Sequence, residues 1–139
     1  LNVEAYVEGE HGDNQVPVFS QVKIGGKKVV FTEEEKAETI KNLRMSALKV
    51  ISKKGATIYA PANNTVNMIE SIVKDKRELC VCSTPLDGEY GLKDLSIGVP
   101  VILGKDGANE ILEWNLSDDE KKAFYLGAEE IKKAINSIL

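Results

Sequence analysis

The sequence predicts an α+β domain in which antiparallel strands pack with long helices. Three observations support this class. The first residues alternate apolar and polar side chains, two segments carry apolar residues at helical spacing behind a capping signal, and three strand-like segments succeed one another over residues 79–116. No linker, repeat or low-complexity tract interrupts the 139 residues, so we expect one domain over residues 1–139.

The N-terminal segment predicts three strands. Val3, Ala5 and Val7 alternate with polar residues, which is typical of a half-buried strand, and this strand should end at Gly9. The later stretch VPVFSQVKIGGKKVVF predicts two strands joined at Gly25-Gly26, because glycines accept the positive φ angles of a two-residue hairpin turn.

Two helices are expected next. Thr32 and Glu35 form a capping box at the start of the first helix, and Gly55 after two lysines is a stop signal. The second helix follows Gly55 and should be offset by Pro61, which cannot donate a backbone hydrogen bond. Their apolar stripes would be Ile40, Leu43, Ala47, Val50 and Ile51 in the first helix, and Ala62, Val66, Ile69 and Val73 in the second.

The last third predicts an antiparallel ladder and a final helix. The segments LCVCSTPL, DLSIGVPVILG and NEILEWNL have strand composition, and GKDG at 104–107 predicts a tight turn between the last two. Ser117 and Glu120 form a second capping box. Gly127 inside this helix costs about 1 kcal/mol relative to alanine, so a looser helix is expected. Its apolar face would be Phe124, Ala128, Ile131, Ile135 and Ile138.

Composition excludes several classes. Net charge is −4 and lysines are interspersed with glutamates, which argues against a nucleic-acid partner. No apolar run approaches the roughly 18 residues of a membrane span, and we expect a cytoplasmic protein. No glycine-rich turn leads from a strand into a helix, so we expect no nucleotide-binding motif in this chain. The start at Leu1, without a methionine or a leader, predicts a piece cut from a longer chain.

Cys80 and Cys82 are the only cysteines, and alternate positions on a strand would place both on one face. Their spacing is too short for an easy disulfide. A metal site would need further cysteine or histidine ligands, and the chain has one histidine, so we expect no metal. We interpret the pair as small buried hydrophobic residues in a reducing compartment.

That single histidine, His11, lies in VEGEHGDNQVP just after the first strand. Gly9 and Gly12 remove bulk on both sides, and an imidazole with a pKa of about 6.5 can exchange a proton near neutral pH. The residues alone leave two interpretations open: a catalytic group on a loop, or the polar tip of a solvated turn. A hydrolase using His11 with Glu10 or Asp13 is disfavoured, since no serine or cysteine nucleophile is near in sequence.

A second candidate segment is KKGATIYAPANN. Its small residues, with the Thr57 hydroxyl and the rigid Pro61, could line one side of a pocket. A plain joint between two helices explains the same residues.

Three segments, taken together and in this order, resemble the C-terminal half of the lactate/malate dehydrogenase family, and the resemblance covers essentially the whole chain. The segments are VEGEHGDNQVP, KKGATIYAPA and LDGEYGLKDLSIGVPVILGKDGANEILEWNLSDDEKKAF. GATIYAPA and GEYG favour the malate branch. The resemblance implies that His11 is the general acid/base that exchanges the hydroxyl proton of a 2-hydroxy acid. It also implies that Thr57 lies beside the substrate and Pro61 near the nicotinamide ring.

Other parts of the family's active site have no counterpart in this sequence. These are the aspartate that orients the histidine, the arginines that bind substrate, and the nucleotide-binding domain for NAD or NADP. Arg44 and Arg77 match none of these motifs. We therefore expect the substrate-binding and proton-transfer domain of a malate or lactate dehydrogenase that assembles as a homodimer or homotetramer. The chain alone should be inactive. The alternative is a non-enzymatic oligomerisation module derived from such an enzyme, using helical faces such as residues 40–51.

Overall fold

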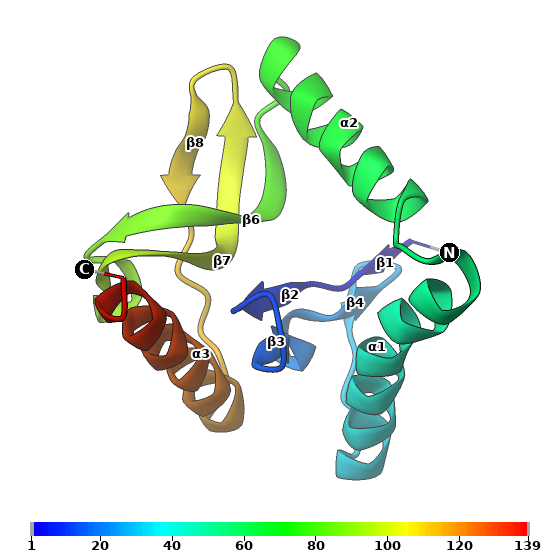
Figure 1. Ribbon diagram of the computed structural model, residues 1–139. Helices are drawn as coiled ribbons and strands as arrows, with labels where there is room; N and C mark the ends of the chain where they lie inside the picture. The colour runs from blue at the N-terminus through cyan, green and yellow to red at the C-terminus, as the bar shows by residue number, and fades with distance from the viewer. Residues whose placement is uncertain (1, 139) are drawn as a thin grey trace.

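The computed structural model describes residues 2–138 and shows strands packed on one helix, with two further helices extending from them (Figure 1). A five-stranded sheet has the order β3-β2-β7-β6 with β8 paired to β7, and a three-stranded sheet has the order β1-β4-β5. This is the predicted α+β class. The elements are β1 (Val3–Glu4), β2 (Val7–Gly9), β3 (Gln15–Pro17), β4 (Lys23–Ile24), β5 (Lys27–Lys28), α1 (Glu33–Lys54), α2 (Tyr59–Val73), β6 (Glu78–Asp87), β7 (Lys93–Gly104), β8 (Gly107–Ile111) and α3 (Asp118–Asn136), with 3-10 turns at Phe19–Gln21 and Glu89–Gly91.

The ladder expected in the last third is confirmed. β6 and β7 pair antiparallel along their length, and β7 turns into β8 through the tight turn at 104–107. Cys82 pairs with Val99 and Cys80 with Val101, so both cysteines lie on the face of the sheet that carries buried β7 residues. The final strand is shorter than expected: it ends at Ile111, and the chain then runs in extended loop to α3.

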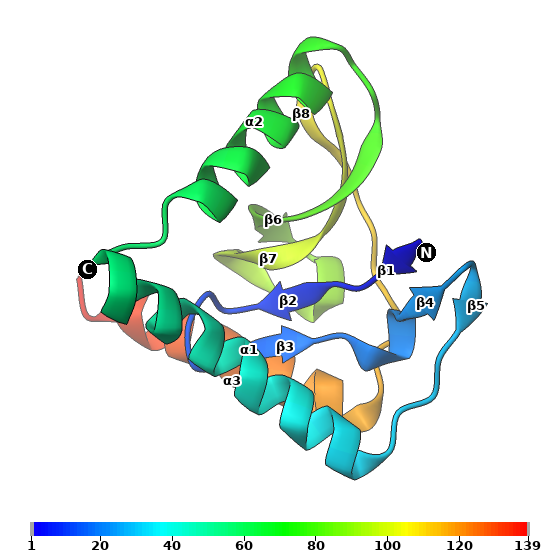
Figure 2. The same ribbon diagram turned by 90° about the vertical axis from the view of Figure 1, so that its right-hand side faces the viewer.

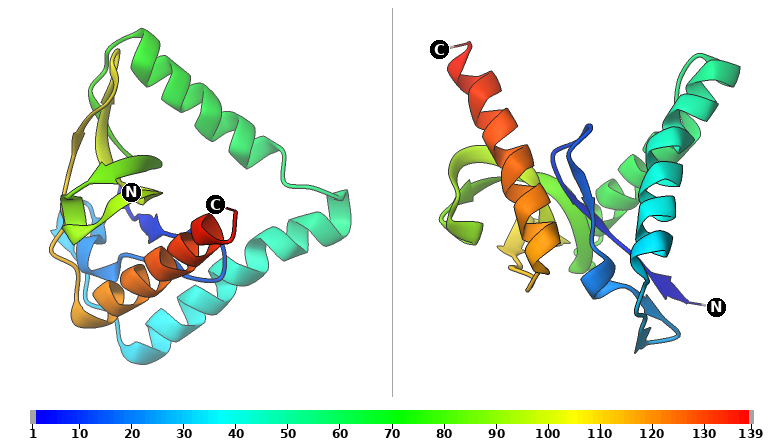
Figure 3. Two further views of the ribbon diagram at one scale, coloured as in Figure 1. Left: turned by 60° about the vertical axis from the view of Figure 1, so that its left-hand side comes forward. Right: turned by 90° about the horizontal axis from the view of Figure 1, so that it is seen from below.

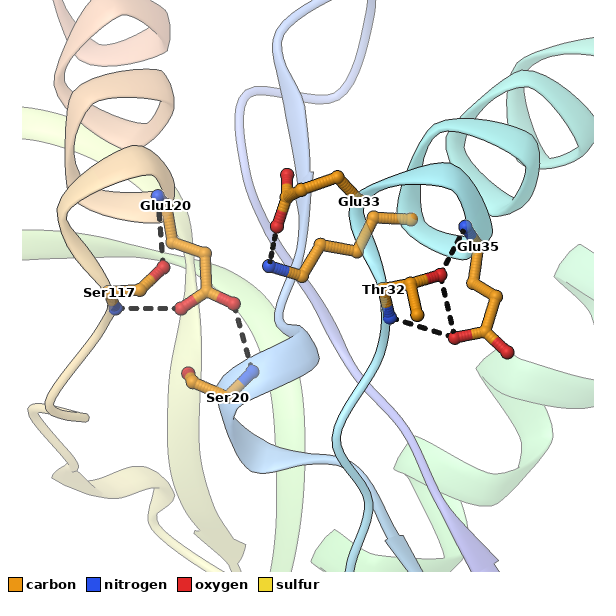
Figure 4. Close-up of polar contacts among 7 residues, drawn as sticks. Ser20, Thr32, Glu33, Glu35, Ser117 and Glu120 are labelled. Carbon is orange, nitrogen blue, oxygen red and sulfur yellow. Dashed lines mark hydrogen bonds and ion pairs between the residues drawn. The ribbon is translucent and has the colours of Figure 1, made fainter.

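Helix α3 closes the core against this sheet. Phe124 and Ala128 are fully buried, Ile131 and Ile135 are partly buried, and Ile138 is exposed beyond the helix end, so the expected apolar face is one residue too long. The capping box is confirmed and does more than begin the helix. Glu120 accepts from Ser117 N at 2.8 Å and from Ser20 N at 2.9 Å, which ties α3 to the chain after β3 (Figure 4).

Helix α1 forms where the local signals place it, but none of its residues is fully buried. The Thr32–Glu35 capping box is present and Gly55 ends the helix at a φ of 79° (Figure 4). Ile40 and Leu43 are half-buried, whereas Ala47, Val50 and Ile51 are exposed. The predicted apolar stripe therefore does not pack into the core of the described residues, apart from its partly covered N-terminal end. The first half of α1 lies beside β3 and the start of α3, where Ile40 lines a shared pocket with Val16 and Ala123. Within residues 2–138, the second half of α1 meets α2 only at their junction (Figure 3), so little surface is available to cover the rest of the stripe.

Helix α2 contacts the sheet through a different face from the predicted one. Val66 and Val73 are 62% and 77% exposed. The face that packs is formed by Met68, Ser71 and Ile72, and the buried Ser71 hydroxyl donates to Leu103 O at 2.9 Å. The helix begins before the proline rather than after it. The first turn of a helix tolerates proline, because the backbone N–H groups there have no intrahelical acceptor.

The N-terminal strand prediction needs a correction. The segment forms two short strands that join different sheets, β1 beside β4 and β2 beside β3 and β7. The inward face is also reversed: Val3 and Val7 are exposed and Glu8 is buried. Glu8 lies opposite the buried Val16 of β3, and α3 packs on both strands, so the face that α3 covers carries the glutamate.

The hairpin at Gly25-Gly26 is confirmed, with both glycines at positive φ. Its strands are only two residues long. No helix in residues 2–138 is long and apolar enough to cross a membrane.

Candidate functional site

His11 lies on the loop that connects β2 to β3. The two strands pair directly from Val7–Pro17 to Gly9–Gln15, so residues 10–14 form a short loop at the end of a hairpin (Figure 2). Gly9 has a φ of +90°, a conformation that a side chain would strain. The His11 side chain is exposed. A paired and buried hairpin thus presents a solvent-accessible imidazole.

Beneath the loop, two glycines allow two strands to approach closely. Gly9 of β2 pairs with Gly98 of β7, and a Cβ at Gly98 would lie 2.9 Å from Gly9 O. Any side chain there would push β2 away from the sheet. This crossing therefore fixes where the β2 strand, and the loop after it, leaves the sheet.

Three backbone amides hold the loop internally. Gly12 N donates to Glu10 O at 3.0 Å, Gln15 N donates to Gly12 O at 3.4 Å, and Asn14 N donates to Glu10 Oε2 at 3.2 Å. His11 therefore lies within the five residues, 10–14, whose ends are joined by the hydrogen bond from Asn14 N to the Glu10 carboxylate. The two interpretations of His11, a solvated turn and a catalytic loop, are thus compatible, since an ordered turn can position a functional side chain.

A cavity of about 490 Å³ opens beside His11. Three small side chains that are distant from His11 in the sequence also line this cavity, together with Gln15. They come from β7, which is the neighbour of β2 in the sheet, and from β6, the next strand beyond it. These residues are Cys82, Ser83 and Ser96.

Glu8, three residues before His11, is a buried carboxyl group. It is 2% exposed, and neither carboxylate oxygen has a hydrogen-bond partner among the described residues. Burial, together with the smaller effect of the nearby Glu120 carboxylate, raises the pKa of Glu8 to about 8. The group therefore holds its proton at neutral pH.

Thr57 and Pro61 lie at the far end of the helical extension. Thr57 is exposed in the connection between α1 and α2, where it lines a separate cavity of about 410 Å³ with Val50, Ile58 and Tyr59. Pro61 is exposed in the first turn of α2. Neither residue lines the cavity beside His11. Within residues 2–138, the three predicted site residues are not brought together.

The two cysteines are free and half-buried. Burial raises the pKa of both thiols, so they are protonated near neutral pH and poor nucleophiles. Over residues 2–138, no cluster of three or more histidine, cysteine, aspartate or glutamate side chains is arranged to hold a metal ion.

Two contacts to the loop escaped the sequence analysis. Arg44 of α1 donates through Nη2 to Asp13 O at 3.0 Å, and no local sequence pattern signals this long-range bond. Gly127 of α3 is buried against Glu10 and Asn14. Here a signal was present, because an isolated glycine within a helix often marks a close approach of another segment.

Comparison with known proteins agrees with the fold and the order of the motifs. The sequence model described as "lactate/malate dehydrogenase, alpha/beta C-terminal domain" matches residues 1–139. Malate dehydrogenase of Halobacterium salinarum is 45% identical over 137 residues, covering 99% of this chain and 45% of that protein. L-lactate dehydrogenase of Bacillus caldolyticus is 38% identical over 142 residues, covering 96% of this chain and 45% of that protein.

Solved structures give the same result. The crystal structure of Cryptosporidium parvum malate dehydrogenase superposes with a TM-score of 0.90 at 36% identity, covering 97% of this chain and 46% of that one. The chain spans less than half the length of the relatives it matches. On the match of its whole length to the family's C-terminal region, this chain belongs to the lactate/malate dehydrogenase family.

Proposed function

We propose that this chain is the substrate-binding and proton-transfer domain of a malate or lactate dehydrogenase that uses NAD or NADP, with His11 as the general acid/base. The observation that carries the proposal is the placement of the chain's single histidine. His11 is exposed on a short, internally bonded loop, beside a cavity of about 490 Å³, in a chain that belongs to this family.

The chemistry assigned to His11 is proton transfer. In oxidation of a 2-hydroxy acid, the neutral imidazole accepts the proton of the substrate hydroxyl as the C–O bond gains double-bond character. In the reverse direction the imidazolium returns it. Since the imidazole is exposed and its loop is held by backbone hydrogen bonds, a substrate can approach it without rearrangement of β2 or β3.

The described residues do not fit the phosphates of a nicotinamide cofactor. Gly25-Gly26 joins β4 to β5, and the 104–107 turn joins β7 to β8, so neither glycine turn leads into a helix N-terminus. We assign cofactor binding to the remainder of a longer protein. The cofactor supplies the hydride acceptor, and the orienting aspartate and substrate arginines would come from that remainder as well.

Thr57 and Pro61 keep the roles that the resemblance implies, beside the substrate and the nicotinamide ring. Both are exposed on the helical extension, away from the His11 cavity. A substrate contacting His11 and Thr57 together would require this extension to be covered and held by the rest of the protein. The similar malate dehydrogenases favour malate over lactate as the substrate.

The test is the His11→Asn variant of the full-length protein, assayed for malate and lactate oxidation with NAD and NADP. Removing a general base should lower kcat by about 10²- to 10⁴-fold, while asparagine preserves the size of the side chain. Lys105→Gln, in the exposed turn between β7 and β8, is the matched control and should retain normal rates. Near-normal oxidation by His11→Asn would remove the basis for this function.

A second function, association of copies of this chain, is favoured by the apolar surface of α1 and α2. Leu48, Val66, Ile69 and Val73 are all exposed. Surfaces of this kind commonly form subunit interfaces. Sedimentation of the isolated chain over a wide concentration range would decide: a strict monomer at high concentration would exclude self-association, and a Val66→Lys variant should dissociate any dimer that forms through this surface.

A further inference from the structure

The His11 loop rests on helix α3 at the one position of that helix without a side chain. A Cβ built at Gly127 would lie 3.0 Å from Glu10 Cβ, 3.4 Å from Glu10 N and 3.4 Å from Asn14 Cβ. The first distance is shorter than carbon atoms tolerate without movement. The loop and the helix are therefore in contact at the closest approach that a glycine allows.

The backbone of α3 does not itself require glycine there. Gly127 is absent from the positive-φ residues and lies inside a continuous helix from Asp118 to Asn136. Glycine weakens a helix interior relative to alanine, so local structure would favour a larger residue. The space taken by the loop accounts for the glycine, and the looseness expected of this helix stays a prediction.

The residue that packs on Gly127 is also the residue that closes the loop. The Glu10 side chain passes over the helix and accepts from Asn14 N at 3.2 Å. The same carboxylate crowds Gly12, where any Cβ would collide with it. Because Gly12 N also donates to Glu10 O at 3.0 Å, displacing Glu10 would disturb both neighbours of His11 in the chain.

A contact from α1 holds the loop at a second point. Arg44 Nη2 donates to Asp13 O at 3.0 Å, two residues after His11. The Arg44 side chain is exposed, and a hydrogen bond at such a site is the weaker of the two restraints. At the contact with α3, Gly127 is buried, and the atoms that it meets are Glu10 Cβ, Glu10 N and Asn14 Cβ rather than the end of a long side chain.

We propose that Gly127 is a positioning residue for His11, acting through Glu10. By leaving room for Glu10 and Asn14, it lets the loop close in the conformation that presents the imidazole to the adjacent cavity. The proposal rests on the function proposed for His11, but its structural claim can be measured without any activity.

The test is Gly127→Ala in the 139-residue chain, followed by NMR and hydrogen exchange. His11 is the only histidine, so its imidazole C–H resonances report the loop without ambiguity. The added methyl should shift these resonances and speed exchange of the Gly12, Asn14 and Gln15 amides several-fold. Asn136→Ala, at the exposed end of the same helix, is the control and should leave both measurements unchanged.

A double-mutant cycle separates crowding from a general loss of folding. Glu10→Gly removes the Cβ that an alanine at 127 would meet, so adding Gly127→Ala to that background should raise Tm, whereas adding it to the parent should lower Tm. This cycle also decides the case if Gly127→Ala alone does not fold, since the double variant should fold. Equal effects of Gly127→Ala in both backgrounds would overturn the proposal.

Activity of the full-length protein gives a separate measurement. Displacement of the imidazole by a few tenths of an ångström should lower kcat about tenfold with little change in KM, because substrate binding would survive while proton transfer would not. If Gly127→Ala raised Tm and left both the His11 resonances and kcat unchanged, Gly127 would have no positioning role. If His11→Asn retains activity but Gly127→Ala still moves the resonances, only the catalytic function fails.

Discussion

Helices α1 and α3 begin with the same signal yet take opposite roles in the structure. Both have a complete capping box and three acidic residues in the first turn. In α3, Phe124 and Ala128 are fully buried against the sheet, whereas α1 contains no buried residue among those described. A capping box therefore determines where a helix starts and says nothing about what the helix packs against. Burial depends on partners distant in the sequence.

The largest expected difference between the two helices is in the cost of removing an apolar side chain. Phe124→Ala should lower the free energy of unfolding by about 3–5 kcal/mol, because it removes a fully buried ring and leaves a cavity. Leu48→Ala in α1, where the side chain is 57% exposed, should cost about 0.5 kcal/mol or less. Urea denaturation of the chain measures both. Equal costs would mean that α1 is packed in solution.

Buried Glu8 should make the stability of the sheet and α3 depend on pH. Its pKa is about 8 in the folded chain against 4.5 in the unfolded chain, so the folded state binds the proton more tightly. Stability is therefore fully present below pH 4.5 and falls as pH rises through 8. Between pH 5 and pH 8 this group alone should account for a loss of about 3 kcal/mol.

Glu8→Gln should remove this dependence, since the amide cannot ionise. Its Tm relative to the parent should rise steadily from pH 5 to pH 8. Glu110→Gln, at an exposed position of β8, is the control and should leave the pH profile unchanged. A parallel pH profile for the parent and Glu8→Gln would show that Glu8 finds a partner or water in solution.

Removing the N-cap side chains of α1 and α3 should give the smallest difference in stability between the two helices. Ser117→Ala should cost about 1 kcal/mol of global stability, because it removes the hydroxyl that accepts from Glu120 N at 3.4 Å, at the start of a helix that packs into the core. Thr32→Ala should fray the first turn of α1 by a similar local free energy but leave the global unfolding transition almost unchanged, since α1 buries no residue. Hydrogen exchange of α1 amides and urea denaturation distinguish the two effects. A global loss with Thr32→Ala would contradict this.

Local patterns predicted the features that depend on neighbouring residues. Capping boxes, the Gly25-Gly26 turn and the stop at Gly55 rely on contacts within a few residues, and all are present. The β6–β7 ladder was also predictable, because two long strands separated by a short turn have few alternative pairings. The order of three motifs, rather than any one residue, indicated the family.

Patterns of alternation did not determine which face is buried. Val3 and Val7 are exposed and Glu8 is buried, because α3 packs on the side of β2 and β3 that carries Glu8 and Val16. In α2 the serine at position 71 points inward while Val66 and Ile69 point out, since the sheet meets the helix obliquely and only part of one face can touch it.

For the candidate site, the sequence alone identified His11 and its loop as the place where proton chemistry is expected. It also identified the helix starts and turns that frame this loop, because these depend on hydrogen bonds and φ angles within a few residues. Only the tertiary structure showed that Gly127, Arg44 and the Gly9–Gly98 crossing meet at that loop. Contacts between residues tens of positions apart depend on how helices and strands pack in space: the isolated glycine of α3 could signal a close approach, but not which segment makes it.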